Sequence, residues 1–538
     1  MTRYNKSFVA NELFIHFAVK NGAPKCLCQM IVKGRLVREF DIELATGGDA
    51  DWWAFYDLTP FKGEQVLLTI DGDHLAETTE LTLEDCIRFG ENLQHAEDLY
   101  KEKYRPQFHF TPRRGWNNDP NGMVFAGGIW HLYYQYNPFG VGWGNMHWGH
   151  AISHDLMYWQ EQPIALYSRS LQDMAFSGGA VVDVNDTAGF RKGFHESGKH
   201  PIVLSFTSTG RGECLAYSLD GGRTHHEYEG NPVLNHQGRD PKIICYEPGK
   251  KWVMIVYEEV GEERGYALYD SHDLKLWRRF QFLPGFYECP ELFSLKIDGD
   301  PQKEKWVIYG STGQQYPSAY MIGNFDGSRF TPEMEPAPAH FGPHFYAAQI
   351  FNHAPDGRRI MMAWLAGAAY PEMPFSQGLT VPLELTLRSL PGGVRLCFEP
   401  VSELATLYRF TSGLQSITIS QANEFLAGWN DELMDIKLGV IPGTSQAVTL
   451  HVRGYPITFH SGEQTIECFG KKAPVSLVEG KLILRVLLDR SVMEVFAGQG
   501  EAAFAGMAIP AVNDVGIYLA GEGTVDRLTL HSLNSIWQ

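Results

Sequence analysis

Short apolar runs separated by turn-forming residues extend through most of the chain. Five of these runs are rich in β-branched and aromatic residues, as half-buried strands are; they are residues 131–136, 201–206, 252–257, 306–309 and 360–364. Each of the first four runs is followed by a turn with Ser or Asn two residues before an aspartate, at Asp155, Asp220, Asp273 and Asp326. The turns recur at intervals of roughly 50 to 65 residues, which is the period of four-stranded propeller blades. The pattern therefore predicts five blades.

The two ends of the chain show a different pattern. Residues 1–84 alternate polar and apolar positions over short runs such as 14–19 and 66–70, which is typical of a small β-sandwich. A charged segment, 85–106, predicts a helical linker; residues 107–395 would form the propeller and 400–538 a second sandwich with a hairpin at 482–496. The expected fold class is all-β: a five-bladed β-propeller flanked by an N-terminal β-sandwich-like domain and a C-terminal β-sandwich.

Three carboxylates stand in similar contexts, each at the start of an apolar run. They are Asp119 in Trp-Asn-Asn-Asp-Pro-Asn-Gly, Asp240 in Gly-Arg-Asp-Pro-Lys and Glu288 in Tyr-Glu-Cys-Pro-Glu. The first strand of every blade lines the central channel, so these acids should meet at one mouth with Ser177 and Tyr346. Three acids repel one another, and at least one should keep its proton near neutral pH. A carboxylate pair with separated pKa values is what cleavage of a glycosidic bond needs.

Several stretches resemble glycoside hydrolase family 32, the invertases, levanases and inulinases that hydrolyse β-fructofuranosides. The matching stretches are residues 116–122, 134–138, 143–150, 176–178, 239–241, 288–293 and 494–496. Their order and spacing extend the resemblance over about residues 105 to 538. The N-terminal segment resembles the extra domain that precedes the propeller in some bacterial levanases.

The resemblance implies retaining hydrolysis of terminal β-D-fructofuranosyl residues from levan, inulin, fructo-oligosaccharides or sucrose. Asp119 would be the nucleophile that forms a covalent fructosyl-enzyme, Glu288 the general acid and then base, and Asp240 the stabiliser of the transition state. Arg239 would neutralise these acids and keep Asp119 ionised, while the two aspartates would keep Glu288 protonated. Substrate-binding side chains would be Asn118, Gln135, Trp143, Phe176, Ser177, Arg239 and Trp364. No metal or organic cofactor is implied.

Other residues have simpler interpretations. Asp-Pro and Asn-Gly form turns, so Asp119 and Asp240 taken singly would be structural turn residues. Cys289 should point away from the channel, because side chains alternate along a strand. Glu494, a lone acid on a predicted sandwich strand, should lie at the surface or make an interdomain contact. The histidines at 147, 150 and 154 would not share one face of a strand, so we expect no metal site there.

Composition limits the class of partner. The chain has 538 residues, enough for two or three domains, and a formal net charge of -18, which argues against nucleic acid or an anionic membrane surface. A neutral carbohydrate is the expected partner, and the oligomeric state is left open. Asn11 and Glu12 interrupt the N-terminal apolar run, so no signal peptide is predicted. We expect a cytoplasmic enzyme, or a secreted or periplasmic one whose leader has been removed.

Alternatives remain open at this stage. A fructosyltransferase would use the same intermediate, and an endo-acting levanase or inulinase would use the same acids on a more open site. A propeller acting on arabinan or xylan with inversion, or a fructan-binding propeller without catalysis, would have less reason to carry all three acid motifs. We expect exo action, since strand starts around a narrow funnel hold one sugar more easily than a passing chain. The preferred substrate among sucrose, inulin and levan is left open.

Overall fold

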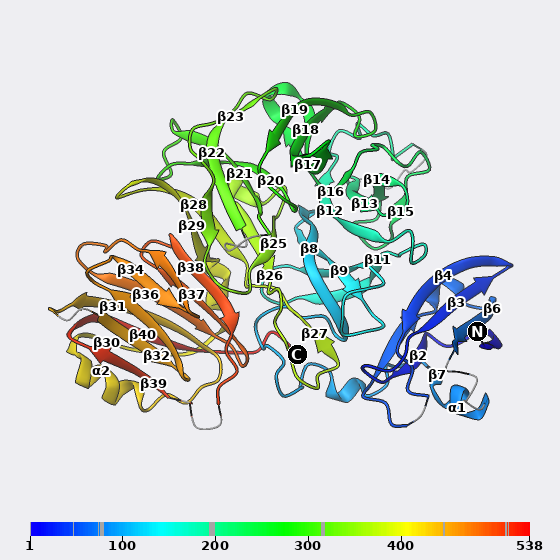
Figure 1. The fold of residues 1–538 in the computed structure, drawn as a ribbon, viewed down its shortest axis with the longest axis horizontal. Coiled ribbons are helices and arrows are strands. Elements are labelled where there is room, and N and C mark those ends of the chain that lie inside the picture. The colour runs from blue at the N-terminus through cyan, green and yellow to red at the C-terminus, as the bar shows by residue number, and fades with distance from the viewer. Residues whose placement is uncertain are drawn as a thin grey trace.

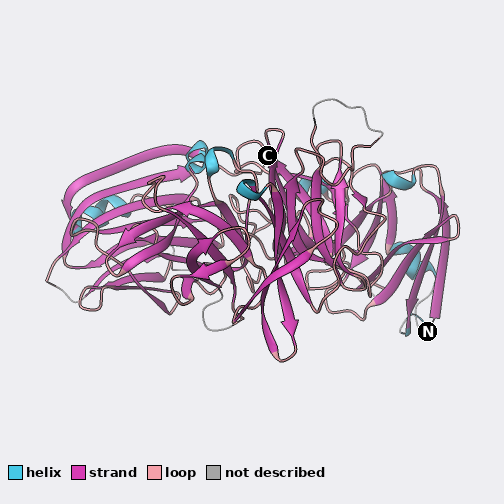
Figure 2. Ribbon diagram, turned by 90° about the horizontal axis from the view of Figure 1, so that it is seen from above, coloured by secondary structure: helices cyan, strands magenta, loops and turns pink. Residues whose placement is uncertain are grey.

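The computed structural model describes residues 2–537 except 47, 74, 76–79, 193–198, 314–317, 445–446, 512–513 and 515. The strands of these residues form nine sheets, and the helices between them are short. Figure 1 shows three bodies: an N-terminal pair of sheets in blue, a ring of five sheets in cyan to yellow-green, and a C-terminal pair in yellow to red. Seen from above, each of the three bodies consists mainly of strands (Figure 2). The expected all-β class, with a five-bladed propeller between two sandwiches, is confirmed.

The N-terminal body is built from two sheets. The first has the order β1 (Thr2–Val9), β6 (Gln65–Gly72), β3 (Cys26–Val32), β4 (Arg35–Ile42), and the second β5 (Trp52–Asp57), β2 (Phe14–Val19), β7 (Ile87–Gly90). Along β3 every second residue is buried, so one face of the first sheet covers the core. The other strands place Phe17, Tyr56 and Leu68 in the same core.

The helical linker expected at 85–106 is wrong. The short helix α1 (Glu80–Asp85) ends where the segment begins, and β7 then pairs with β2 as the edge of the second sheet. Ile87 is buried, and the ring of Phe89 lies 4.7 Å from that of Phe8. Apolar residues thus recur at every second position, which favours a strand over a helix. Beyond β7 the described segment contains one 3-10 turn, Ala96–Asp98.

Each blade of the propeller begins with an inner strand. Blades one and two are β8 (Gly115–Ala126), β9 (Ile129–Asn137), β10 (His147–Ser153), β11 (Gln160–Leu166), and β12 (Ala175–Val182), β13 (Ile202–Ser208), β14 (Gly212–Ser218), β15 (His226–Glu227). Blade three is β16 (Gly238–Tyr246), β17 (Lys251–Val260), β18 (Glu263–Ser271), β19 (Arg278–Pro284). Blade four is β20 (Glu291–Lys296), β21 (Glu304–Ser311), β22 (Ser318–Phe325), β23 (Phe330–Pro332), with β24 (Ala337–His340) also on β22. Blade five is β25 (Tyr346–Ile350), β26 (Ile360–Trp364), β28 (Leu383–Leu390), β29 (Gly393–Pro400).

The ring is closed by a segment that leaves blade five. The short strand β27 (Phe375–Ser376) pairs in parallel with β8, at Gly115 and Trp116.

The aspartate turns after the third strands are also present. In blade one, for example, the Asp155 carboxylate accepts hydrogen bonds from the backbone amides of Met157 and Tyr158 at 3.0 and 2.9 Å, which fixes the turn into the outer strand.

The C-terminal body is a sandwich of two sheets. The first sheet has the order β30 (Tyr408–Thr418), β40 (Gly523–Leu533), β31 (Met434–Pro442), β36 (Leu482–Leu488), β37 (Val492–Ala497), β38 (Ala502–Met507). The second has the order β35 (Lys471–Pro474), β34 (Thr465–Cys468), β33 (Tyr455–His460), β32 (Ala447–Val452), β39 (Ile517–Gly521). The expected hairpin is the antiparallel pair β36 and β37. Helix α2 (Ile419–Leu426) begins with a capping box at Thr418.

A buried histidine joins the propeller to this sandwich. His109 Nδ1 lies 2.8 Å from Asp489 Oδ2 and Nε2 lies 2.9 Å from Glu494 Oε1, and all three side chains are 0% exposed. Asp489 also accepts the backbone amides of residues 107–109, and Glu494 accepts that of Val381 at 2.8 Å. Burial lowers the pKa of His109, but the hydrogen bonds and charges of the two acids outweigh it and raise the pKa to about 9. Glu494 therefore makes an interdomain contact, and the surface alternative is wrong.

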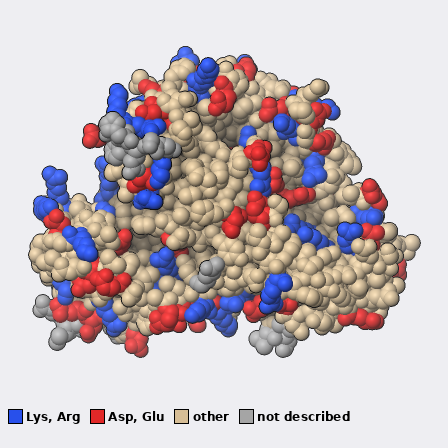
Figure 3. Space-filling model, turned by 180° about the vertical axis from the view of Figure 1, so that it is seen from behind, with Lys and Arg blue, Asp and Glu red and all other residues tan. Residues whose placement is uncertain are grey.

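Charged side chains of both signs are scattered over the face of the molecule seen in Figure 3. On the face opposite to that of Figure 1, acidic and basic side chains lie side by side in small groups (Figure 3). Among the residues that the structure describes, no helix is both long enough and apolar enough to cross a bilayer.

Candidate active site

The inner strands of four blades break their pairing at the same place. The register shifts between Asn117 and Pro120 on β8, Ala175 and Gly178 on β12, Arg239 and Lys242 on β16, and Tyr346 and Gln349 on β25. A bulge removes a residue from the regular alternation and redirects its side chain. Asp119, Ser177 and Asp240 all lie inside these breaks. The recurring bulge is thus how the fold turns blade-start side chains towards one mouth of the channel.

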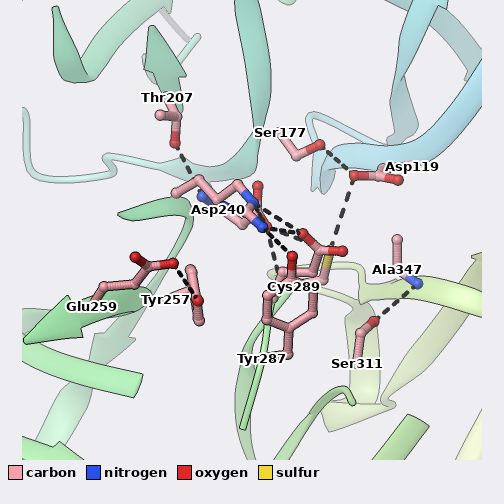
Figure 4. A network of polar contacts seen from close by, with 12 residues as sticks. Asp119, Ser177, Thr207, Asp240, Tyr257, Glu259, Tyr287, Cys289, Ser311 and Ala347 are labelled. Atoms are coloured by element: carbon pink, nitrogen blue, oxygen red, sulfur yellow. Dashed lines mark hydrogen bonds and ion pairs between the residues drawn. The ribbon is translucent and has the colours of Figure 1, made fainter. Parts of the chain in front are cut away.

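The three predicted acids share one site: Cys289 lies between Asp119 and Asp240 (Figure 4), and the charge of Glu288 acts on both aspartates. The Cys289 thiol lies 3.6 Å from Asp240 Oδ2 and 3.9 Å from Asp119 Oδ2, and its backbone amide donates to Asp240 Oδ2 at 3.2 Å. The expectation that Cys289 points away from the channel is wrong. Its φ is 57°, and β20 starts only at Glu291, so strand alternation does not apply to it.

Glu288 is held by Arg239 and Tyr346. Arg239 donates from Nε and Nη2 to Glu288 Oε2 at 2.9 and 2.7 Å, and from Nη2 to the Tyr287 hydroxyl at 2.9 Å. The Tyr346 hydroxyl donates to Glu288 Oε1 at 2.6 Å. Arg239 lies farther from Asp240, with Nε 3.9 Å from Oδ2. The guanidinium thus binds one acid directly and acts on the others through space.

Asp119 receives its hydrogen bonds from neutral side chains. Ser177 Oγ donates to Oδ2 at 2.6 Å and Asn118 Nδ2 donates to Oδ1 at 3.1 Å. Asn118 is itself oriented by Trp116, whose Nε1 donates to its Oδ1 at 3.0 Å. Arg239 was expected to keep Asp119 ionised. It binds Glu288 directly instead, and Asp119 receives no direct bond from it among the contacts described.

Burial decides the protonation of the two aspartates. Burial raises the pKa of Asp119 to about 6, and the charge of Glu288 adds to this, whereas Ser177, Asn118 and Arg239 oppose it. The pKa of Asp240 is raised well above its usual range by burial and by the charges of Glu288 and Asp119. Of the two aspartates, Asp240 is the more deeply buried, and Arg239 binds Glu288 more closely than it binds Asp240.

The remaining predicted substrate-binding residues surround this group. Gln135 is buried and donates Nε2 to the carbonyl of Ala175 at 3.0 Å, directly before Phe176 and Ser177. Trp143 is 54% exposed, and its ring meets that of Phe176 edge-on at 6.0 Å. Trp364 donates from Nε1 to Gln377 Oε1 at 3.0 Å. Its ring stands edge-on to Trp116 and Tyr346, with centroids 6.0 and 6.2 Å away.

Sequence reasoning missed three residues of this site as contacts: Trp116, Tyr287 and Cys289. Tyr346 was expected to meet the acids, because it stands at the start of the fifth inner strand, and its hydroxyl does bond Glu288. Trp116, Tyr287 and Cys289 lie within the acid motifs themselves. What could not be read was the direction in which each side chain points.

The three closely spaced histidines point to different surroundings. His150 stacks on Tyr133 with centroids 4.2 Å apart, His147 Nδ1 meets the carbonyl of Asn145, and His154 is exposed. Within the described part of the chain, His95, Glu97 and Asp98 could bring ligand atoms together, on the exposed surface.

Comparison with known proteins gives two family matches. Residues 109–400 match the model for the glycosyl hydrolases family 32 N-terminal domain, and residues 445–536 match the model for the family 32 C-terminal domain. A levanase of Bacillus subtilis is 37% identical over 493 residues, covering 81% of this chain and 72% of the levanase. An extracellular exo-inulinase of Aspergillus niger is 31% identical over 525 residues, covering 81% of this chain and 96% of the inulinase.

A solved structure agrees with these matches. The crystal structure of exo-inulinase from Aspergillus awamori superposes with a TM-score of 0.72 at 27% identity. The match covers 81% of this chain and 100% of that one. The family models begin at residue 109, so the N-terminal sandwich lies outside them.

Proposed function

Since the chain belongs to glycosyl hydrolase family 32, we propose that it releases terminal β-D-fructofuranosyl residues with retention of configuration. It is a glycoside hydrolase of the kind that includes levanase, inulinase and invertase. The observation that carries the proposal is the meeting of Asp119, Asp240 and Glu288 at one mouth of the propeller, with Ser177 and Arg239 bound to two of them. Retaining glycosidases use a nucleophilic carboxylate and an acid/base carboxyl group in this way.

In the first step Asp119 attacks the anomeric carbon of the terminal fructose and Glu288 gives its proton to the leaving oxygen. The bond to the leaving sugar breaks and a covalent fructosyl-enzyme forms on Asp119. In the second step Glu288 takes a proton from water, the water oxygen attacks the same carbon, and Asp119 leaves. Tyr346 and Arg239 donate hydrogen bonds to the two oxygens of Glu288 at 2.6 and 2.7 Å. They stabilise the carboxylate that forms when Glu288 gives up its proton.

Asp240 does not react in this scheme. Burial and the charges of its neighbours raise its pKa, so it is suited to a hydroxyl-binding role in which it shares a proton with the sugar. Hydrogen bonds of this kind strengthen as oxocarbenium character develops. We expect Asp240→Asn to lower kcat far more than it changes KM, as steady-state kinetics on sucrose would show. A change in KM alone would contradict the role.

The proposed substrates are fructans, fructo-oligosaccharides and sucrose, cleaved one fructose at a time from the non-reducing end. Trp143, Phe176, Trp364 and Asn118 support a site for one terminal sugar. Asn118 bonds Asp119, Trp143 meets the ring of Phe176 next to Ser177, and Trp364 meets the ring of Trp116. Tryptophan faces bind the apolar edges of sugars, and amides bind hydroxyls. No metal or organic cofactor has a role in these steps.

The direct test is incubation with sucrose, inulin and levan, with chromatography and NMR of the products. We expect fructose as the first product from inulin and levan, with β-fructose as the first-formed anomer. First-formed α-fructose would mean inversion and would exclude Asp119 as the nucleophile. A ladder of short fructans would show endo action instead, and products longer than the substrate would show a fructosyltransferase.

Cellular location is a separate proposal. The relative from Aspergillus niger is named extracellular, which supports the secreted or periplasmic alternative given above over the cytoplasmic one. Assay of cell fractions for release of fructose from sucrose decides between the two.

A further inference from the structure

The connection between β9 and β10 reaches out of the propeller into the N-terminal sandwich. Phe139, its second residue, is buried in the core of that sandwich, and its ring stacks on Phe40 with centroids 3.7 Å apart. Phe17 and Tyr56 lie on other sides of the same ring, at 6.3 and 6.2 Å. Val141 packs against the same core. The start of this loop is therefore anchored by apolar burial in a different domain.

The end of the loop is anchored by hydrogen bonds to the same domain. The backbone amide of Asp41 donates to Asn145 Oδ1 at 2.9 Å, and Asn145 Nδ2 donates to the carbonyl and to Oδ1 of Asp41 at 2.9 and 3.0 Å. Asn145 is buried and adopts a φ of 45°. Asp41 is paired with Lys25 at 2.9 Å. Buried, fully bonded amides of this kind fix the backbone that carries them.

Between the two anchors stands Trp143, whose ring lies edge-on to Phe176, the neighbour of Ser177. The segment reads Phe-Gly-Val-Gly-Trp-Gly-Asn from residue 139 to 145. Three glycines in seven residues give such a loop many conformations, and fixing them costs conformational entropy. A Cβ on Gly144 would lie 3.9 Å from Lys25 Nζ and 4.0 Å from Asp41 Oδ1, so the sandwich lies directly beside Trp143. The exposed indole thus stands on a flexible sequence that is held by the neighbouring domain and, within the propeller, by Asn137, whose Nδ2 donates to the Gly142 carbonyl at 2.9 Å.

We propose that the N-terminal sandwich is part of the substrate site, with Asp41 and Phe40 as positioning residues that hold Trp143 against the sugar units entering the mouth. The inference rests on the proposed function, because it concerns how that site binds β-fructans. Preorganisation lowers the entropic cost of binding, so the expected consequence lies in KM rather than in kcat. The N-terminal sandwich lies outside the family matches, which begin at residue 109. The positioning role gives this domain a function in substrate binding.

The test is a double-mutant cycle on Trp143 and Asn145, measured with a short inulin oligosaccharide. Asn145→Gly removes the bonds to Asp41 together with one to Asn137 Oδ1 at 3.0 Å within the propeller, and it tolerates a positive φ. The Asp41 variants below isolate the contact with the sandwich. We expect KM to rise about 10-fold in Trp143→Ala and about 5-fold in Asn145→Gly, with kcat within about 3-fold, and no further rise in the double variant. Multiplicative effects on KM in the double variant, or an unchanged KM in Asn145→Gly, would overturn the proposal.

Matched variants separate positioning from general damage. Glu39→Ala cuts a different contact between the same two bodies, the bond from the Leu171 amide to Glu39 Oε1 at 3.1 Å, and should leave KM unchanged. Asp41→Asn keeps an oxygen acceptor for Asn145 and should restore most of what Asp41→Ala loses. An equal KM rise in Glu39→Ala would overturn the positioning role. Failure of the unaltered enzyme to cleave any β-fructoside would instead overturn the proposed function, and is seen before any variant is made.

Discussion

Two places in this molecule gather buried acids around one cation, with opposite results. At the interface of propeller and C-terminal sandwich, His109 lies between Asp489 and Glu494, each bonded to one ring nitrogen. At the mouth of the propeller, Arg239 binds Glu288 directly, while Asp119 and Asp240 receive weaker or more distant help. The first arrangement lowers the pKa of Asp489 and the second raises those of both aspartates.

The difference lies in the number of hydrogen bonds that each carboxylate receives. Asp489 accepts four backbone amides and one imidazole, which more than offset its burial. Asp119 accepts one hydroxyl and one amide from side chains. An acid that is fully bonded holds domains together, and one left short of donors retains the capacity to react. In this protein the reactive carboxylates are those whose burial is only partly offset by hydrogen bonds.

The largest expected effect is loss of turnover in the reactive cluster. Asp119→Asn and Glu288→Gln should each lower kcat by at least ~10³, or about 4 kcal/mol of activation free energy, because no neighbour can replace a nucleophile or an acid/base group. Steady-state kinetics on sucrose, with circular dichroism to check the fold, measures this. Near-normal turnover in either variant would contradict the assigned roles.

The interface cluster should respond in stability and leave the chemistry intact. His109→Leu leaves two buried carboxylates without their cation and should lower the free energy of unfolding by about 3 kcal/mol, measured by urea denaturation. The raised His109 pKa means that its contribution is complete below about pH 6.5 and is lost as pH rises through about 9. The difference between the two proteins should therefore shrink above pH 9. A variant as stable as the parent at pH 6 would refute the role of the cluster.

A smaller effect should appear in the pH profile. Asp119 must be ionised to attack, and its pKa is raised to about 6, so kcat/KM should fall about tenfold per unit below pH 6. Ser177→Ala removes a hydrogen bond that lowers this pKa, and the acid limb should move to higher pH. An acid limb centred near pH 4, or one that does not move in the variant, would count against Asp119 as the titrating nucleophile.

The smallest effect is expected at Cys289. Its thiol contacts Asp240 and Asp119 at 3.6 and 3.9 Å, which are weak donations, whereas its backbone amide bond to Asp240 survives any side-chain change. Cys289→Ser should leave kcat within about 3-fold, and Cys289→Ala within about 10-fold, by the usual worth of one weak hydrogen bond. Loss of turnover comparable to that of Asp119→Asn would give the thiol a chemical role that it lacks here.

Much of this architecture could be predicted because it is written locally. Strands such as β2 and the hairpin of β36 and β37 follow from alternation, and the blades follow from the period of the aspartate turns. The acids could be located because their motifs recur at blade starts. Side-chain direction could not, since Cys289 depends on a left-handed backbone position that strand alternation does not describe.

Long-range partners were equally hidden. His109 and Asp489 lie far apart in sequence, and nothing local marks either as half of a pair. Arg239 lies 2.7 Å from Glu288 and 3.9 Å from Asp240. No local pattern gives such distances, which explains why Arg239 was assigned to Asp119 rather than to Glu288. The N-terminal sandwich was predicted as a domain, but its contact with the loop of Trp143 was not.

The short strand β27 sets an order of events during synthesis. Its residues 375 and 376 pair with Gly115 and Trp116 on β8, only a few positions before Asp119. A ribosome that has made blade one has therefore not yet supplied the last neighbour of the strand that carries this acid. The segment between the paired residues holds the inner strands of the other four blades, and closing so long a loop is slow. The strand of Asp119 therefore gains its last neighbour late, after the strands that carry Ser177, Asp240 and Tyr346 have been made.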